Sequence, residues 1–481
     1  MRGEKRQRRR LKRPGVLIVV QNLPVPMDRR VWLECKALTA AGYQVSVICI
    51  AGPGDPPYEL LDGVHIYKYK PAPQANGTLG FVWEFAYSWC RAAALSLRVW
   101  RRHGFDVLQA CNPPDTYWLL GFLYRLVGKR FVYDQHDLNP EVFLSRFGEP
   151  SGGIRQVQYR MLLTLERLTY RFAHRVISTN ESYREVAMTR GGRASSDVTV
   201  VRSGPDTSVM RPVADPAEAA DLRRGRRYLA CYLGIMGPQD GVDVLLDAAD
   251  HYVHVLGRDD CHFALLGFGD CLDDLKAQCT SLGLDEFVTF TGRADSAKIA
   301  AYLSEADVGL SPDPLSPLND VSTMNKTMEY MAYAVPVVAF DLKETRVSGG
   351  NAAVYVDPSD VEGFAKALGA LLDDDEQRAD MAVQARLRAA AELDWRPQAK
   401  AYVGVYDSLL GIERNWAKDS DEWPAVERRH RHADPPRDAR GHRLVDLRNL
   451  ETLRRFIKTR GVVGQPTDDP SPPTASESEA R

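Results

Sequence analysis

Short continuous runs of apolar residues alternate along this chain with longer stretches in which apolar residues recur every three or four positions. The runs at residues 15–21 and 45–50 are rich in β-branched side chains, as in parallel strands buried on both faces. The stretch between them has the spacing of an amphipathic helix. This order predicts right-handed crossovers and an α/β doubly wound sheet, which binds ligands beyond the C-terminal ends of its strands.

The same alternation continues to about residue 393, and 481 residues exceed what a single compact core accommodates. The sequence therefore predicts two domains with extensions. Strands of the first domain are expected at 106–110, 130–134, 175–179 and 198–202, in addition to the two above. Strands of the second are expected at 228–235, 263–266, 287–291, 307–310, 335–340 and 353–356.

Residues 317–341, PLNDVSTMNKTMEYMAYAVPVVAFD, combine a short helix with a buried strand. Ser322 or Thr323 is expected to cap the helix, which covers about residues 325–333. A helix N-terminus presents free N–H groups and the positive end of a dipole, so an anionic phosphate is a natural ligand there. Lys326 would add a full positive charge.

Ser322, Lys326 and Glu329 stand at i, i+4 and i+7 and so share one face of this helix. A carboxylate one turn away from a phosphate site suits ribose, because each oxygen accepts a hydrogen bond from a hydroxyl group. The constellation predicts a nucleoside-diphosphate site. Taken without its neighbours, the pattern favours an ordinary amphipathic helix with its three methionines packed inward.

The stretch resembles the donor-binding motif of the retaining GT-B glycosyltransferases of family 4, also called glycosyl transferases group 1. In that motif a helix ending in Glu-Tyr/Ala-Met-Ala precedes a Pro-Val-Val strand. The resemblance implies a nucleoside-diphosphate sugar as co-substrate, bound by this helix and by Ser322 and Thr323. The matching residues are Asn325, Lys326, Glu329, Tyr330, Met331, Ala332, Pro336, Val337 and Val338.

Two features depart from the family pattern. The common motif has a second glutamate eight residues before the first, and here that position is Val321. Most members also carry an Arg and, five residues later, a Lys for the diphosphate, whereas residues 235–241 contain no basic residue. The expected replacements are Lys326 and Arg293, the latter in the turn FTGRAD after a strand.

The segment DQHDLNPE after the strand at 130–134 resembles the His-Asp loop of the family. By this resemblance His136 reaches the donor sugar, while Asp137 and Glu141 lie nearer the acceptor. A lone histidine is more often structural, so the assignment depends on the family. Together with Lys326, His136 and Asp137 are the expected catalytic residues.

Two glycines and two arginines complete the candidate site. Gly267 and Gly269 in GFGD could let the backbone approach a phosphate closely, although a lone G-x-G is a weak signal. Arg29 and Arg30 end the first loop, NLPVPMDRR, where the family usually has glycines near the acceptor. They could bind a phosphate of the donor or of a lipid-linked acceptor, or they could be surface residues of a helix start.

The resemblance covers about residues 15–412 and implies a transferase of the GT-B fold, with two Rossmann-like domains facing a cleft and retention of anomeric configuration. The acceptor would be a lipid-linked glycan or a polysaccharide of the cell envelope. The expected parts are a basic arm at 1–13, an acceptor domain at 14–210, a nucleotide-sugar domain at 211–396, a helix crossing back at 397–412 and a polar extension at 413–481, in which 445–457 could form a short helix.

Two other functions fit the same pattern. A non-hydrolysing nucleoside-diphosphate-sugar 2-epimerase of this fold would bind the same nucleotide and transfer nothing to an acceptor. A membrane-peripheral scaffold subunit with a decayed donor site would explain Val321 and the missing basic pair. Donor hydrolysis without an acceptor would argue against the scaffold.

The composition limits the classes of partner and cofactor that we expect. A formal net charge of −2 argues against nucleic-acid binding, and no segment approaches the ~20 apolar residues that span a bilayer. The eight cysteines lack zinc spacing, so we expect no metal, no cofactor and a reducing cytoplasm.

Two segments raise the question of a membrane surface. The first 13 residues carry eight Lys or Arg against one Glu, which suits an anionic membrane or a merely solubilising tail. Residues 79–102, rich in Trp and Arg, suit an interfacial helix or a helix packed on the sheet. The sequence thus allows a cytoplasmic enzyme that is peripheral on the inner face of the plasma membrane.

Overall fold

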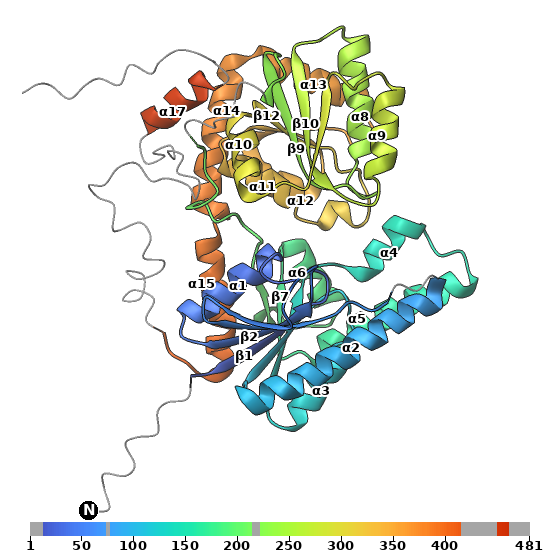
Figure 1. Ribbon diagram of the computed structural model, residues 1–481, viewed down its shortest axis with the longest axis vertical. Helices are drawn as coiled ribbons and strands as arrows, with labels where there is room; N and C mark the ends of the chain where they lie inside the picture. The colour runs from blue at the N-terminus through green and yellow to red at the C-terminus, as the bar shows by residue number, and fades with distance from the viewer. Residues whose placement is uncertain (1–12, 74–76, 214–221, 415–449, 461–481) are drawn as a thin grey trace, which may run out of the picture.

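A computed structural model describes residues 13–73, 77–213, 222–414 and 450–460. It has two α/β domains, one above the other in Figure 1, each built on its own twisted sheet. The predicted α/β fold with two Rossmann-like domains is confirmed.

The first domain contains an eight-stranded sheet in the order β3-β4-β2-β1-β5-β6-β7-β8. Only the β3–β4 pair is antiparallel, and these two strands were not predicted from the sequence. The strands are β1 (Gly15–Val19), β2 (Gln44–Ile50), β3 (Tyr58–Leu61), β4 (Val64–Tyr69), β5 (Val107–Cys111), β6 (Arg130–Gln135), β7 (Arg175–Ser178) and β8 (Val198–Val200).

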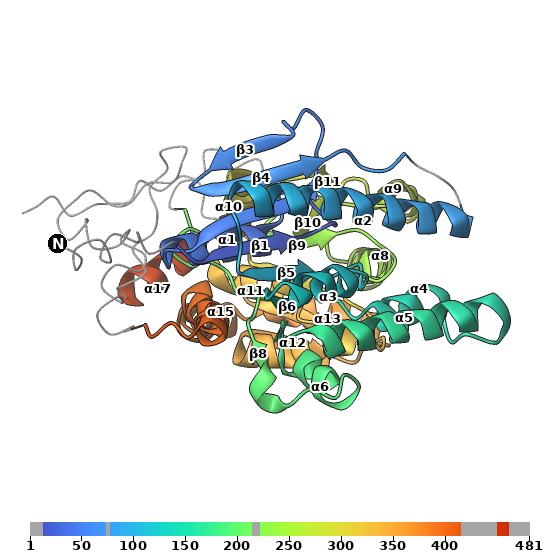
Figure 2. The same cartoon turned by 90° about the horizontal axis from the view of Figure 1, so that it is seen from below.

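Helices cover both faces of this sheet. Helices α2, α3, α5 and α6 pack on one face, and α1 packs on the other together with a helix from the end of the second domain. Figure 2 shows α2 and α5 running along the same side of the molecule. The helices are α1 (Arg29–Ala40), α2 (Gly77–Arg102), α3 (Trp118–Leu126), α4 (Asn139–Phe147), α5 (Gly153–Phe172) and α6 (Glu181–Thr189).

The second domain contains a six-stranded parallel sheet in the order β11-β10-β9-β12-β13-β14. Its strands are β9 (Tyr228–Ile235), β10 (Cys261–Phe268), β11 (Val288–Gly292), β12 (Val308–Ser311), β13 (Val337–Phe340) and β14 (Ala353–Val356). Its helices are α8 (Val242–Asp250), α9 (Leu272–Ser281), α10 (Ser296–Glu305), α11 (Asn325–Ala332), α12 (Lys343–Gly349), α13 (Val361–Asp373) and α14 (Asp375–Arg388).

Helix α15 (Trp395–Leu410) leaves the second domain and packs against α1 of the first. It begins two residues earlier than the sequence suggested, because Pro397 fits in a first turn whose N–H groups have no intrahelical partner. The side chain of Asp394 caps the helix by accepting from the N–H of Arg396.

A further helix, α17 (Leu450–Thr459), packs on α14 of the second domain. The guanidinium of Arg460 donates hydrogen bonds to the carbonyl oxygens of Ala306, Tyr333 and Ala334, where α10 and α11 end. The helix overlaps the segment expected at 445–457, of which residues 445–449 lie outside the described part of the chain. In the described part of the chain, no helix has the length and apolar character needed to cross a membrane.

Candidate functional site

A polar cavity of about 240 Å³ lies between the two domains. It brings together His136 and Asp137 from the first domain with the segment before α11 from the second. Five of the residues predicted for catalysis or donor binding therefore share one cavity. Its lining consists of Arg30, His136, Asp137, Thr179, Tyr183, Ser203, Ser322, Thr323 and Asn325.

His136 follows β6 directly and is held from behind by the buried carboxylate of Asp134. The imidazole Nε2 lies 2.8 Å from Asp134 Oδ2 and 3.2 Å from Arg30 Nε. Nε2 can donate a hydrogen bond to Asp134 or accept one from Arg30, but it cannot do both at once. The shorter distance to the carboxylate favours an N–H on Nε2. Burial alone would raise the pKa of Asp134, but Arg30 and His136 outweigh it and lower that pKa. This arrangement leaves Nδ1 as the ring nitrogen that a ligand can contact.

Arg30 supports this pair rather than standing at the surface. Its guanidinium is buried and lies 2.9 Å from Asp134 Oδ1 and 3.1 Å from Glu34 Oε1, and it donates to Val201 O at 2.8 Å and Ser203 Oγ at 2.9 Å. The sequence predicted an acceptor contact or a surface residue. The surface alternative is wrong, because Arg30 is buried and these four partners fix its guanidinium at the wall of the cavity.

Asn112 holds the loop that carries His136 and Asp137. Its Oδ1 accepts from the backbone N–H groups of His136 at 2.7 Å and Asp137 at 3.2 Å, and its Nδ2 donates to the carbonyl of Asp137 at 2.8 Å. Asn112 was not predicted from the sequence. The available signal was an asparagine at the C-terminal end of a strand, followed by two prolines.

A second layer of hydrogen bonds connects this site to α15. The amide of Gln109 donates to Asp134 Oδ2 and to Glu34 Oε2, both at 2.9 Å. Its Oε1 accepts from the hydroxyl groups of Tyr402, at 2.6 Å, and Tyr406. The helix that crosses between the domains thus contacts the carboxylate behind His136 through one glutamine.

The two acidic residues of the His-Asp loop lie in different surroundings. Asp137 lines the cavity, and burial raises the pKa of its carboxyl group although His136 and Arg146 oppose the shift. Glu141 lies outside the cavity lining and forms an ion pair with Arg190, with oxygen–nitrogen distances of 2.5 and 3.0 Å. An acceptor contact by Glu141 stays a prediction.

Helix α11 begins at Asn325, and its N-cap is Met324, without a side-chain cap. The predicted capping by Ser322 or Thr323 is therefore wrong, because both hydroxyl groups bind elsewhere. Ser322 Oγ lies 2.9 Å from Tyr183 OH, and Thr323 Oγ1 accepts from Asn180 Nδ2 at 3.0 Å. The two hydroxyl groups join the domains, and the N–H groups of the first turn keep no side-chain acceptor.

Lys326 is not the isolated charge that the sequence suggested. Its Nζ lies 2.5 Å from Asp313 Oδ1 and 4.9 Å from the ring centroid of Tyr232. Burial opposes the charged form, but Asp313 and Asp240 outweigh it and raise the pKa of Lys326. Its side chain reaches the end of β9, since a Cβ built on Gly234 would lie 3.3 Å from its Cε. The ammonium group therefore lies near the place where the family usually carries its basic pair.

Glu329 forms an ion pair with Arg29 of the first domain. The pair joins a residue predicted to bind the donor ribose with one predicted to bind the acceptor. The Arg29 side chain is 40% exposed and that of Glu329 is 12% exposed, so the contact is open to solvent on one side. In this conformation of the cleft the carboxylate already has a cationic partner.

The two glycines of the GFGD segment allow strands β9 and β10 to end side by side. A Cβ on Gly267 would lie 2.0 Å from Gly234 O, and one on Gly269 would lie 2.4 Å from Met236 O. Neither position tolerates a side chain. This packing accounts for the glycines without a ligand, so their contact with a phosphate stays a prediction.

Arg293 is exposed at the end of β11, with its guanidinium 4.8 Å from the ring centroid of Phe268. It also contacts the sulfur of Met27 in the first loop. Arg293 thus lies at the rim of the cleft beside the GFGD segment.

Val321 ends a short 3-10 helix (Asn319–Val321). Its side chain packs beside Leu138, Tyr183 and Leu318. The neighbouring Asp320 accepts a hydrogen bond from the N–H of Lys343 at the start of α12, at 2.9 Å. No acidic side chain of this short helix replaces the missing glutamate.

One group of side chains has the spacing of metal ligands. Ligand atoms of Cys111, Asp134 and His136 lie within 4.8 Å of one another. The guanidinium of Arg30 binds this same carboxylate, so a metal ion there would meet a fixed positive charge. The donor set does not fit a resident cation.

Comparisons with known proteins identify the family. Residues 27–204 match the glycosyl transferase 4-like domain, and residues 227–374 match glycosyl transferases group 1. Glycogen synthase from Mycobacterium tuberculosis is 24% identical over 434 residues, which are 85% of this chain and 96% of that protein. A phosphatidyl-myo-inositol mannosyltransferase from Mycobacterium leprae is 33% identical over 174 residues, which are 36% of this chain and 44% of that protein.

Solved structures show the same fold. Sucrose-phosphate synthase from Thermosynechococcus elongatus has a TM-score of 0.67 at 18% identity, covering 83% of this chain and 100% of that one. Anabaena HepE in complex with UDP and glucose has a TM-score of 0.60 at 19% identity, with the same coverage. The two family matches fall in the two domains and together span more than half of the sequence. The chain therefore belongs to the group 1, family 4 glycosyltransferases of the GT-B fold and is a nucleoside-diphosphate-sugar-dependent transferase.

Proposed function

We propose that this enzyme moves a sugar to a lipid-linked or polysaccharide acceptor of the cell envelope and retains the anomeric configuration of its donor. The observation that carries the proposal is the interdomain cavity, in which the uncapped N-terminus of α11 faces the His136–Asp137 loop. The acceptor class is supported by relatives that are named for phosphatidyl-myo-inositol and for glycogen.

In this proposal the second domain binds the donor along α11. The first-turn N–H groups and Lys326 contact the diphosphate, and Glu329 accepts hydrogen bonds from the ribose hydroxyl groups. Arg293 adds charge at the rim beside Gly267 and Gly269. Because Asp313 offsets part of the Lys326 charge, the helix N-terminus and Arg293 supply much of the attraction.

The leaving diphosphate gains negative charge as the bond between the anomeric carbon and its oxygen breaks. Preorganised N–H groups and cations at that place lower the barrier, because they interact more strongly with the transition state than with the bound donor. His136 contacts the sugar from the opposite wall through Nδ1. Its orientation is fixed before the donor arrives, since Asp134 holds Nε2.

Retention is supported by the state of the acidic groups near the cavity. An inverting reaction needs a base that removes the acceptor proton on the face opposite the leaving group. Glu141 is tied to Arg190 and lies outside the cavity lining, so Asp137, whose pKa is raised by burial, is the one acid of this loop that lines the cavity. A same-face reaction needs no such base, because the departing phosphate oxygen takes the proton.

Proton NMR of the fresh product tests retention. The anomeric coupling constant, compared with that of a donor of known configuration, is expected to be unchanged. An inverted product would overturn this part of the proposal and make Asp137 the best candidate for the base.

We also propose that transfer needs no resident metal, and chelation with EDTA is expected to leave the rate unchanged.

A thermal-shift screen of nucleoside diphosphates and their sugars can identify the donor. A ligand at 100 times its dissociation constant adds about 2.7 kcal/mol to the free energy of unfolding. A flat response to every nucleotide would contradict the donor site.

We further propose that the enzyme works at the inner face of an anionic membrane. The basic arm at residues 1–13 supports this, because basic residues are attracted to anionic leaflets. Removal of the arm is expected to reduce sedimentation with anionic vesicles at low salt while turnover of a soluble acceptor stays intact. Salt at about 0.1 M screens charges beyond about 10 Å and should remove the difference.

A further inference from the structure

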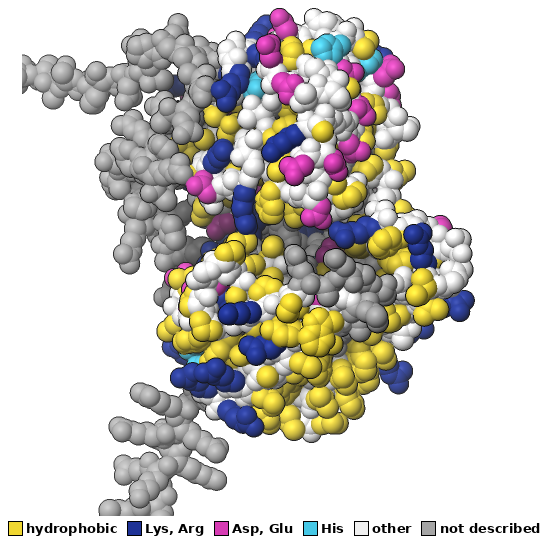
Figure 3. Space-filling model, turned by 45° about the vertical axis from the view of Figure 1, so that its right-hand side comes forward, with side chains coloured by type: hydrophobic (Ala, Val, Ile, Leu, Met, Phe, Trp, Pro, Cys, Tyr) yellow, Lys and Arg dark blue, Asp and Glu magenta, His cyan; other side chains and the backbone are white. Residues whose placement is uncertain are grey.

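The outer face of α2, α3 and α5 is unusually apolar for a surface. Leu126 is 68% exposed, Ile154 69% and Val157 65%, and Trp83 and Leu123 are also exposed. Figure 3 shows a broad hydrophobic surface over the first domain, whereas charged side chains are scattered over the second. The inner sides of the same helices pack on the sheet, which confirms the packing alternative raised for the helix at 79–102, while the interfacial alternative stays a prediction.

The charges on these three helices are nearly all positive. Their sequences contain nine arginines and two glutamates, Glu84 and Glu166, although the whole chain has a net charge of −2. Glu166 is buried and paired with Arg190, so Glu84 is the one exposed acid on these helices. In a parallel α/β domain these helices end at the edge opposite the strand ends that bind ligands. Arg102, Arg125 and Arg171 thus lie at the edge away from the cleft.

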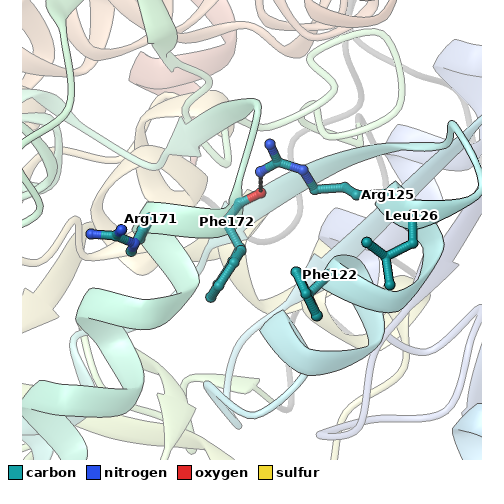
Figure 4. Close-up of a pocket in the computed structure, with 5 residues that line it drawn as sticks. All are labelled: Phe122, Arg125, Leu126, Arg171 and Phe172. Carbon is teal, nitrogen blue, oxygen red and sulfur yellow. Dashed lines mark hydrogen bonds between the residues drawn. The ribbon is translucent and has the colours of Figure 1, made fainter.

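A hollow of about 430 Å³ lies between α3 and α5 on this face. Its apolar part is formed by Phe122, Leu126 and Phe172. Figure 4 shows Arg125 reaching over it toward the backbone of Phe172, and Arg171 beyond Phe172 with its guanidinium pointing outward. Arg125 Nη1 donates to the carbonyl oxygen of Phe172 at 2.5 Å, which fixes one guanidinium at the rim. An apolar floor with cationic sides suits a molecule that is part hydrocarbon and part phosphate.

We propose that the outer face of α2, α3 and α5 lies on an anionic phospholipid leaflet and that the hollow binds one anionic phospholipid. Its hydrocarbon would pack on Phe122, Leu126 and Phe172, and its phosphate would bind at Arg125 and Arg171. The inference rests on the proposed function, in which the enzyme works at a membrane, and it adds the surface and the lipid chemistry.

Charge complementarity selects this partner among the possible occupants. A second copy of the chain would bring the same positive face and would be repelled. Arginines with aromatic and aliphatic side chains match the headgroup layer and the hydrocarbon beneath it. Such an orientation leaves the cleft between the domains uncovered.

Vesicle flotation of the full chain tests the proposal, with phosphatidylcholine vesicles that contain or lack phosphatidylglycerol. The wild-type protein is expected to float with the anionic vesicles and much less with the neutral ones. Arg125→Glu/Arg171→Glu is expected to lower the partition coefficient by about 25-fold or more, because each of the two basic residues near the surface contributes about fivefold. Lys36→Glu/Lys400→Glu changes the same charge on α1 and α15, on the opposite face of the sheet, and is expected to float like the wild type.

Two further pairs of substitutions test the same surface in the flotation assay. Arg160→Glu/Arg171→Glu replaces the first pair if the loss of the Arg125 hydrogen bond prevents folding. Leu123→Ser/Leu126→Ser is expected to remove the binding that persists at high salt. Equal flotation of the arginine variants and the wild type, or an equal loss in the lysine control, would overturn the proposed surface.

The donor site is checked separately, by the thermal shift that nucleoside diphosphates cause in each variant. An unchanged shift shows that the fold and the donor site are intact. A wild-type protein that floats with anionic vesicles but binds no nucleotide would contradict the proposed transferase reaction and leave the lipid surface standing. Nucleotide binding without flotation would do the reverse.

Discussion

The two walls of the cleft are built in different ways. The wall of the second domain is one continuous segment, in which Asn325, Lys326 and Glu329 follow each other on α11. The wall of the first domain is assembled from distant parts, since Arg30 and Asp134 are 104 residues apart. The donor side is therefore local in the sequence, whereas the sugar side depends on a buried network of distant residues. We expect substitutions in the first to change binding and substitutions in the second to change stability.

The largest effect is expected for Asp134→Ala. The substitution removes one of the two carboxylate partners of the buried Arg30, and removal of one partner from a buried pair costs about 3 to 5 kcal/mol. Urea denaturation of the variant measures the free energy of unfolding. Asp341→Ala is the matched control, because it breaks an exposed pair with Arg346 and should cost about 1 kcal/mol or less. Similar losses in both variants would show that the network behind His136 is not a special source of stability.

Local pattern was sufficient to predict the fold and the donor helix. Strand β9 and the start of α11 lie where the apolar periodicity placed them, because each element satisfies its backbone within a short segment. The antiparallel pair β3–β4 was missed: Tyr58, Leu60 and Leu61 of β3 are exposed, so this edge strand lacks the continuous apolar run of a buried one.

The partners of the site residues could not be predicted in the same way. Asp313 offsets part of the charge of Lys326, and Arg29 pairs with Glu329. The sequence around Lys326 and Glu329 does not indicate either contact. The role of Gln109 could not be predicted for the same reason, because it depends on the contact between β5 and α15 in the folded chain. Periodicity specifies which face of an element is buried, and it does not specify which polar groups meet there.

A second effect concerns the donor wall, where Glu329→Ala is expected to weaken nucleotide binding. Each lost charge-assisted hydrogen bond to ribose is worth about 1.5 to 3 kcal/mol, a loss of roughly ten- to a hundredfold in affinity. Calorimetry with the nucleoside diphosphate measures it. An unchanged affinity would remove Glu329 from the site.

Arg29→Ala sharpens this test, because it removes the cationic partner of Glu329 without touching the carboxylate. If the ion pair competes with ribose, the variant should bind the nucleotide at least as tightly as the wild type. A loss equal to that of Glu329→Ala would instead make Arg29 a donor contact.

A smaller effect is expected for Asn112, which positions the loop of the first domain. Asn112→Ala removes three hydrogen bonds to His136 and Asp137, and the loop should lose its fixed geometry. We expect kcat to fall by about tenfold, which is the ratio for about 1.4 kcal/mol, while nucleotide affinity stays the same because α11 is unaffected. Asn112→Asp keeps the acceptor for the two N–H groups and should retain more activity. An equal loss of nucleotide affinity would show that the two walls are not independent.

The smallest effect concerns pH, and it tests a feature that the two domains share. Burial, with Arg224 and Arg226, lowers the pKa of His262 in the second domain to about 4, and burial with Arg125 and Arg130 does the same for His174 in the first. Below about pH 6.5 the unfolded chain binds a proton at each of these histidines that the folded protein does not bind, so stability rises with pH in this range. The stability that the two neutral histidines contribute is fully present above about pH 6.5 and is lost as the pH falls toward about 4. His262→Gln removes one of the two histidines. It should reduce the change in the free energy of unfolding between about pH 4 and 6.5 by about 1 kcal/mol, after allowance for solvent screening. Thermal unfolding at several pH values measures the slope, and a slope unchanged in His262→Gln and His174→Gln would assign the acid sensitivity to the carboxylates of the cleft instead.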